Sequence, residues 1–184
     1  MTHRPIVRLG HPALRTPAIE VPQEQIGSAE LERLISEMAE AMHEAEGVGL
    51  AAPQLGIGLQ VFLYLGSAAE EAGGGEVRVV INPMIEPEPG DLEEDWEGCL
   101  SIPGLRGLVP RHPAIRLRGL DRNGEPVDYC AQGYEARVIQ HEFDHLNGVV
   151  FLDRMGDLKS LAFLDEWRTY LNDASEEAGA EREE

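Results

Sequence analysis

The segment His141-Glu142-Phe143-Asp144-His145 is the feature that most restricts what this chain can fold into. Residues i and i+4 lie on one face of an α-helix, so both imidazoles can reach a single metal ion if the segment is helical. The same helix has an apolar face, formed by Tyr134, Val138, Ile139 and Leu146. Two imidazoles buried there without a partner would be costly. We therefore expect a partly buried helix over residues 134–147 that carries a metal site.

The spacing of residues in the sequence does not by itself identify the third protein ligand of this metal. A mononuclear catalytic metal usually has three protein ligands and one position for water, and no histidine follows His145. Glu166, 21 residues after His145, would suit a zinc peptidase. Cys99, flanked by Gly98, could supply a thiolate instead, and Cys99 together with Cys130 could close a four-ligand structural site. For Cys130 we favour a strand residue packed in the core.

The charge balance excludes two classes of partner. The 184 residues include 15 Lys+Arg and 34 Asp+Glu, which gives a formal net charge of −19. DNA affinity depends on neutralised phosphates and membrane docking on attraction to anionic lipids, so we expect neither DNA nor a membrane as a partner. No run approaches the roughly 18 apolar residues of a membrane span, and two cysteines are too few for a disulfide framework. We expect a cytoplasmic protein.

The remaining patterns indicate an α+β chain with one domain. Apolar spacing predicts helices over residues 29–45 and 158–171, and prolines exclude a helix before residue 25. Strand-like runs occupy 61–65 and 77–82, and Asn123-Gly124 predicts a hairpin between strands near 115–118 and 127–130. We expect a single domain over residues 1–172 and an acidic, flexible tail over 173–184.

Three ordered segments resemble the motifs of the peptide deformylase family. Residues 47–54 read GVGLAAPQ and are similar to G-x-G-[LI]-A-A-x-Q. Residues 97–101 read EGCLS and are similar to E-G-C-[LI]-S, and residues 140–148 read QHEFDHLNG and are similar to Q-H-E-x-D-H-L-x-G. The similarity runs from about residue 6 to about residue 155.

This resemblance implies a fold, a metal and a reaction. The fold would be antiparallel sheets packed around a central helix that carries the HExxH motif, with a C-terminal helix. The metal would be bound by Cys99, His141 and His145; Fe²⁺ is the family's usual ion, and Zn²⁺, Ni²⁺ or Co²⁺ suit the same ligands. The reaction would remove the N-formyl group from nascent formyl-methionyl chains at the ribosome. The product of that group would be formate. We expect the enzyme to be a monomer.

The resemblance also implies roles for single residues. Glu142 would be the general base and acid that acts on a metal-activated water. The side chain of Gln54 and the backbone N–H of Leu100 would stabilise the oxyanion. Binding of the peptide would involve five residues, namely Val48, Gly49, Arg106, Tyr134 and Val138.

Overall fold

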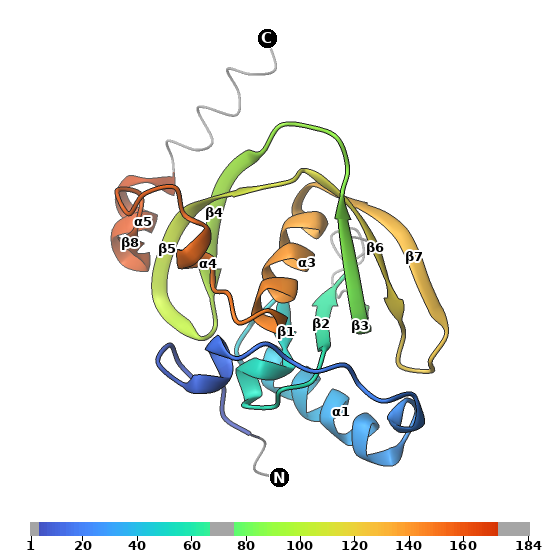
Figure 1. The fold of residues 1–184 in the computed structure, drawn as a ribbon. Helices are drawn as coiled ribbons and strands as arrows, with labels where there is room; N and C mark the ends of the chain where they lie inside the picture. The colour runs from blue at the N-terminus through green and yellow to red at the C-terminus, as the bar shows by residue number, and fades with distance from the viewer. Residues whose placement is uncertain (1–3, 67–75, 173–184) are drawn as a thin grey trace.

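The computed structural model describes residues 4–66 and 76–172, which form an α+β fold around one central helix (Figure 1). One sheet has five strands in the order β1-β2-β3-β6-β7, and the other has three in the order β4-β5-β8. All paired strands are antiparallel. Among the described helices, none is long and apolar enough to cross a membrane. The expected fold class is confirmed.

The strands of the five-stranded sheet are β1 (Gly49–Ala51), β2 (Val61–Leu65), β3 (Val77–Pro87), β6 (Ala114–Leu120) and β7 (Pro126–Gln132). Those of the smaller sheet are β4 (Glu93–Cys99), β5 (Ile102–Arg111) and β8 (Ala162–Phe163). The α-helices are α1 (Ala29–Glu44), α3 (Gly133–Leu146), α4 (Phe151–Arg154) and α5 (Leu164–Tyr170). Short 3₁₀ turns are η1 (Pro12–Arg15), η2 (Gln23–Gln25) and η3 (Ala52–Leu55).

Helix α1 forms as its apolar spacing predicts. The Ser28 side chain accepts a hydrogen bond from the Leu31 backbone N–H and caps the first turn. The residues that this helix buries recur at three- and four-residue steps, namely Leu31, Ile35, Met38 and Met42. They pack with the inner residues of β1 and β2, so α1 covers one face of the five-stranded sheet.

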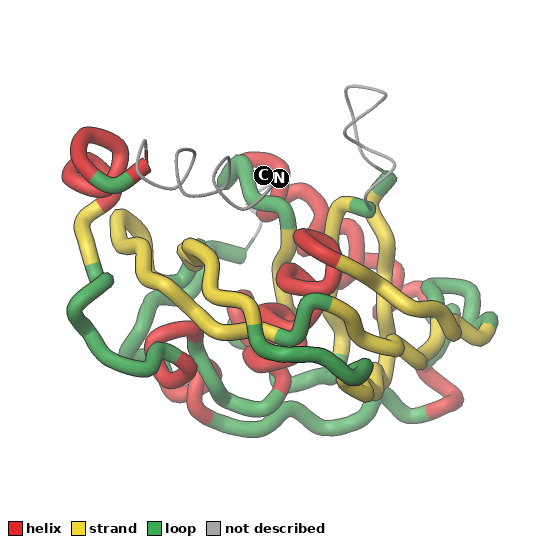
Figure 2. Tube along the Cα trace, turned by 90° about the horizontal axis from the view of Figure 1, so that it is seen from above, coloured by secondary structure: helices red, strands yellow, loops and turns green. Residues whose placement is uncertain are grey.

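Helix α3 lies between the two sheets (Figure 1). It packs against β1 and β2, and its far side faces the β4–β5 hairpin. In the view from above, the strands surround α3 and the C-terminal helix stands apart at one edge (Figure 2). Gly148, at φ +71°, ends the helix in the left-handed region, and an added Cβ there would lie 2.8 Å from the backbone carbonyl of Arg15. The N-terminal arm therefore packs directly against the end of α3.

Three local predictions differ from the structure. Strand β3 continues past Pro83 to Pro87, because the ladder to β6 is interrupted between Ile81 and Met84 and needs no proline N–H there. The helix predicted over residues 158–171 begins only at Leu164, after β8. Cys130 is exposed on the edge strand β7, so the expectation of a core position is wrong. The predicted tail, residues 173–184, lies outside the described residues.

Candidate active site

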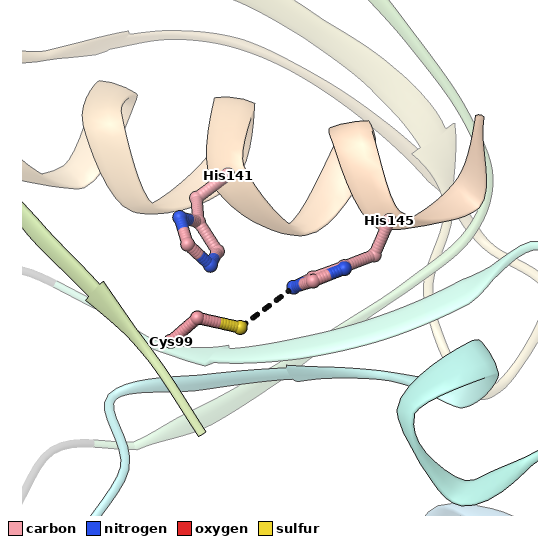
Figure 3. A group of neighbouring side chains, drawn as sticks. All are labelled: Cys99, His141 and His145. Atoms are coloured by element: carbon pink, nitrogen blue, oxygen red, sulfur yellow. Dashed lines mark hydrogen bonds between the residues drawn. The ribbon is translucent and has the colours of Figure 1, made fainter. Parts of the chain in front are cut away.

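Two elements from different layers bring three ligating atoms together. Cys99, at the end of β4, faces His141 and His145 on α3 (Figure 3). One sulfur and one nitrogen from each imidazole lie within 4.8 Å of one another. This cluster is the one group of three or more His, Cys, Asp or Glu within residues 4–66 and 76–172 that has metal-binding geometry.

The donor set fits a metal ion. Cys99 Sγ lies 3.3 Å from His145 Nε2. Metal–sulfur and metal–nitrogen bonds of about 2.3 and 2.0–2.1 Å at a tetrahedral angle would separate these atoms by about 3.5 Å. His141 Nδ1 donates to Glu97 Oε2 at 2.8 Å, which leaves Nε2 facing the cluster. A carboxylate that fixes the far nitrogen of a ligating histidine is common at metal sites.

The two histidines differ in their protonation. Burial lowers the pKa of His145 well below its usual value, so its imidazole is neutral, the form that binds metals. For His141, burial also lowers the pKa, but hydrogen bonds with Cys99 and Glu97 outweigh it and raise the pKa well above the usual value. The raised pKa places a proton on His141, in the hydrogen bond with Cys99. A metal ion bound by Cys99 and His141 would take the place of this proton.

Glu97 is the centre of a buried ionic network. Its carboxylate accepts bonds from Arg111 Nε at 2.8 Å and from an Arg137 guanidinium nitrogen at 2.9 Å, besides the bond from His141. Burial would raise the pKa of Glu97, but the hydrogen bonds from His141 and Arg111 outweigh it and lower the pKa to about 2. Glu97 is therefore ionised, and it joins β4 to β5 and α3.

Asp144 extends this network on the opposite side of Arg111. It lies 2.6 Å from Arg111 and 2.6 Å from Arg154, and it is 3% exposed. Asp144 therefore does not face the metal-binding cluster, although it stands between the two histidines in the sequence. It anchors α3 to β5 and α4.

Glu142 is a buried carboxylate beside the cluster. It is 4% exposed, and its Oε2 has no hydrogen-bond partner among the described residues. Burial raises its pKa to about 7. A Cβ added to Gly49 would lie 2.5 Å from Glu142 Oε1, so the backbone of β1 packs directly against the carboxylate. A glycine is required at this close approach.

Gln54 also faces the cluster, from the turn η3. Its Oε1 accepts from the Ala51 backbone N–H at 2.8 Å, and its Nε2 lies 3.7 Å from Cys99 Sγ and 3.3 Å from Ser101 Oγ. The side chain is 1% exposed, so its amide group has a fixed orientation. Leu100, the residue after Cys99, packs against Gly47, where an added Cβ would lie 2.7 Å from Leu100 Cδ1.

A cavity of about 510 Å³ opens over the cluster. The residues predicted for the site lie along its wall, with the exception of His145. The lining includes Val48, Gly49, Gln54, Cys99, Leu100, Arg106, Tyr134, Val138, His141 and Glu142. Val48 and Tyr134 are 41% and 58% exposed, so they stand at the rim, whereas Val138 is buried.

All eight residues predicted for catalysis or peptide binding line this cavity. Of the three predicted ligands, Cys99 and His141 line it and His145 does not. The predicted residues therefore converge on one cavity, although they come from β1, η3, β4, β5 and α3.

The two alternative third ligands lie elsewhere. Glu166 is exposed on α5 and does not belong to the cluster, so the alternative in which it supplies the third ligand is wrong. Cys130 Sγ lies 3.6 Å from Glu88 on the surface, far from the closed four-ligand site considered for it. Geometry thus selects Cys99, which spacing alone left open.

Sequence reasoning missed the partners of Glu97. Arg111 and Arg137 are 5% and 6% exposed, and nothing in their immediate sequence indicates burial. One signal was present for Arg137, which stands one helical turn before His141 on the same face of α3. A charged residue in that position requires a buried counter-charge.

Comparisons with known proteins agree with this geometry. The family model described as Polypeptide deformylase matches residues 3–161. Peptide deformylase 2 of Pseudomonas syringae pv. tomato is 45% identical, over 88% of this chain and 92% of that protein. Peptide deformylase 1 of Nitrosomonas europaea is 43% identical, over 88% and 93%. The Met-Ala-Ser-bound crystal structure of the class I type b peptide deformylase from Acinetobacter baumannii superposes with a TM-score of 0.77 at 34% identity, covering 84% of this chain and 99% of that one.

Proposed function

Because this chain belongs to the polypeptide deformylase family, we propose that its Cys99, His141 and His145 hold the metal ion of a deformylase active site. The family removes the N-formyl group from the N-terminal methionine of nascent peptides, and this chain is an enzyme of that kind. The observation that supports the assignment best is the convergence of one sulfur and two imidazole nitrogens beside a buried carboxylate.

We propose Fe²⁺ as the ion bound in the cell. Held by Cys99, His141 and His145, a divalent ion would supply Lewis acidity, both to activate a water and to polarise the formyl carbonyl. The thiolate and imidazole donors also suit Zn²⁺, Ni²⁺ and Co²⁺. Air should inactivate an iron-loaded sample faster than a nickel-loaded one, because the ferrous ion and its thiolate ligand are oxidised.

Glu142 is the proposed general base and acid. It accepts the proton of the attacking water and then delivers it to the leaving amine. Its unpartnered Oε2 supports this role, since a buried carboxylate oxygen without a donor is free to take a proton. The close approach of Gly49 holds the carboxylate at the cavity wall.

Gln54 and Leu100 are the proposed oxyanion donors. The Gln54 Oε1 bond to the Ala51 N–H turns the amide so that its Nε2 faces Cys99. The backbone N–H of Leu100 follows the ligand Cys99 directly, so it is held by the same turn of chain. Donors that are fixed before the reaction stabilise developing negative charge without reorganisation.

The edge strand β1 is the proposed docking site for the peptide backbone. Among the strands of the described residues it pairs with β2 alone, and Gly49 belongs to it. An extended peptide can add to such an edge through main-chain hydrogen bonds. Val48, Tyr134 and Val138 would contact the methionine end of the peptide, and Arg106 its continuation.

Replacement of Glu142 by Gln tests this assignment. The variant should retain the metal and lose formate release from formyl-Met peptides, because the amide cannot accept the proton. Near-normal turnover by a fully metal-loaded Glu142→Gln variant would contradict the assignment of the base. In parallel, Cys99→Ser should lose metal, while the surface variants Glu166→Ala and Cys130→Ser should retain it.

We propose further that the enzyme acts as a cytoplasmic monomer on nascent chains at the ribosome. Residues 1–172 would form the catalytic domain and 173–184 a tail. Sedimentation velocity should give one species of monomer mass, and cosedimentation with translating ribosomes should decrease as salt rises. A stable dimer would contradict the proposed monomer. An absence of cosedimentation at low salt would contradict the proposed action at the ribosome.

A further inference from the structure

The mouth of the cavity is built partly by the C-terminal segment. Strand β8 pairs with β5 through Arg106 and Ala162, and α5 follows directly. Leu164, the first residue of α5, lines the cavity. In Figure 1 this segment lies beside β5, on the side away from β6 and β7. The family match ends at residue 161, so this part of the wall comes from residues beyond it.

Arg106 is held on two sides at this mouth. A Cβ added to Gly98 would lie 3.0 Å from Arg106 Nε, so the side chain crosses the backbone of β4 at its glycine. The guanidinium carbon lies 5.4 Å from the centre of the Trp167 ring on α5. Trp167 also makes an edge contact with Trp96, another lining residue, at 5.9 Å between ring centres.

The charges of the cavity leave Arg106 available to a ligand. Glu97 and Arg137 pair with each other at 2.9 Å, and His141 and Glu142 belong to the proposed metal site. Arg106 forms no salt bridge with any residue in 4–66 or 76–172, and neither does Glu46, the other charged residue of the lining. An arginine over an aromatic ring keeps its in-plane N–H donors for a carboxylate.

We propose that Trp167 is a positioning residue that holds Arg106 at the cavity mouth, where Arg106 binds an acidic side chain at the second or third position of the formylated peptide. This inference rests on the proposed function, because the cavity must take a peptide. Packing between Gly98 and Trp167 fixes the guanidinium before the peptide arrives, so less side-chain freedom is lost on binding.

Formylated peptide amides provide the test. Formyl-Met-Asp-Ala-amide and formyl-Met-Ala-Asp-amide are compared with their Asn counterparts, so that only one charge differs and the C-terminal carboxylate is absent. The wild type should favour Asp in at least one position by about twofold to fivefold in kcat/KM, the range of an exposed ion pair. Trp167→Ala should remove this preference through KM, and Trp167→Phe should restore part of it.

Two variants provide matched controls. Tyr170→Ala removes the other aromatic residue of α5, which is 71% exposed, and should leave the preference unchanged. Glu46→Gln removes the opposing charge and should increase the preference for Asp. Arg106→Gln should abolish the preference for Asp. In the double variant, Trp167→Ala should cause no further change in that preference, so the test stays valid even if Trp167→Ala alone disturbs α5.

Two results would overturn the inference. One is a wild type that does not distinguish Asp from Asn in either position. The other is a Trp167→Ala variant that changes KM for Asp and Asn peptides by the same factor, as a purely structural role would. Calorimetric binding of Met-Ala-Asp-amide and Met-Asp-Ala-amide against their Asn forms gives a separate readout. If no formylated peptide releases formate, the proposed function fails, and the binding difference still decides whether Arg106 recognises the acid.

Discussion

Substitution of Gly49 by Ala should displace the Glu142 carboxylate without removing it. The variant therefore tests how strongly catalysis depends on the position of that group. The added Cβ would lie 2.5 Å from Glu142 Oε1 and 2.9 Å from Cδ, whereas ordinary contacts begin at 3.4 Å. The carboxylate must therefore move by about 0.9 Å, the difference between the two contact distances. A misplacement of about 1 Å at a reacting group costs on the order of 10²-fold in rate. We expect kcat to fall by about that factor.

The stability of the Gly49→Ala variant should change much less. Gly49 lies in β1 outside the left-handed region, and the atoms that its Cβ meets are the end of a side chain. Overpacking of this kind costs about 1–3 kcal/mol, which for a protein of this size lowers the Tm by roughly 2–12 °C. Metal content should be unchanged, because the new methyl group meets Glu142 and not a proposed ligand.

The assay is formate release by metal-loaded enzyme, with kcat and KM measured separately. Gly107→Ala is the matched control, because its Cβ would meet Met155 Cε at 2.6 Å and no proposed catalytic group. Gly58→Ala, with no atom within 4 Å of its Cβ, controls for the substitution itself. A Gly49→Ala variant that keeps its metal and stays within threefold of wild-type kcat would refute the reasoning. So would a Gly107→Ala variant with an equal loss of kcat.

Three further predictions concern other parts of the site. Gln54→Ala should lower kcat by about 10²–10³-fold with the metal retained, as measured by formate release, because one oxyanion donor is lost; an unchanged kcat would remove Gln54 from that role. Glu97→Ala should destabilise the fold by about 3–5 kcal/mol in denaturant unfolding, because the buried Arg137 and Arg111 both lose the counter-charge of Glu97, and only Arg111 keeps Asp144; a loss below 1 kcal/mol would mean that water enters the network. Gly148→Ala should lower the Tm measured by calorimetry by roughly 4–20 °C, since a left-handed residue is strained and its Cβ would meet backbone at 2.8 Å; an unchanged Tm would show that the N-terminal arm moves away.

Elements with a regular apolar pattern could be predicted from the sequence. Helix α1 was expected over 29–45 and spans Ala29–Glu44, and the hairpin at Asn123-Gly124 joins β6 to β7 as expected. These patterns are local, because each is set by side chains within one or two turns of chain. The metal-binding helix belongs to the same class, and its expected range of 134–147 agrees with Gly133–Leu146.

The β4–β5 hairpin could not be predicted in the same way. Residues 93–97 read EEDWE, which is typical of a solvated stretch, yet Glu97 is buried there. Its burial depends on Arg111 and Arg137, which lie 14 and 40 residues away in the sequence. Only the fold brings these charges together. The choice between Cys99 and Glu166 as the third metal ligand depends on the position of the same hairpin. Residue spacing alone therefore could not make this choice.

The ion pairs around Glu97 have a consequence for metal exchange. They hold β4, the strand that carries Cys99, against α3, the helix that carries His141 and His145. We therefore expect the metal to leave and return without refolding of the chain, unlike in small domains that metal binding folds. The ion found in a purified sample would therefore report the metals supplied during growth and purification as much as the preference of the site.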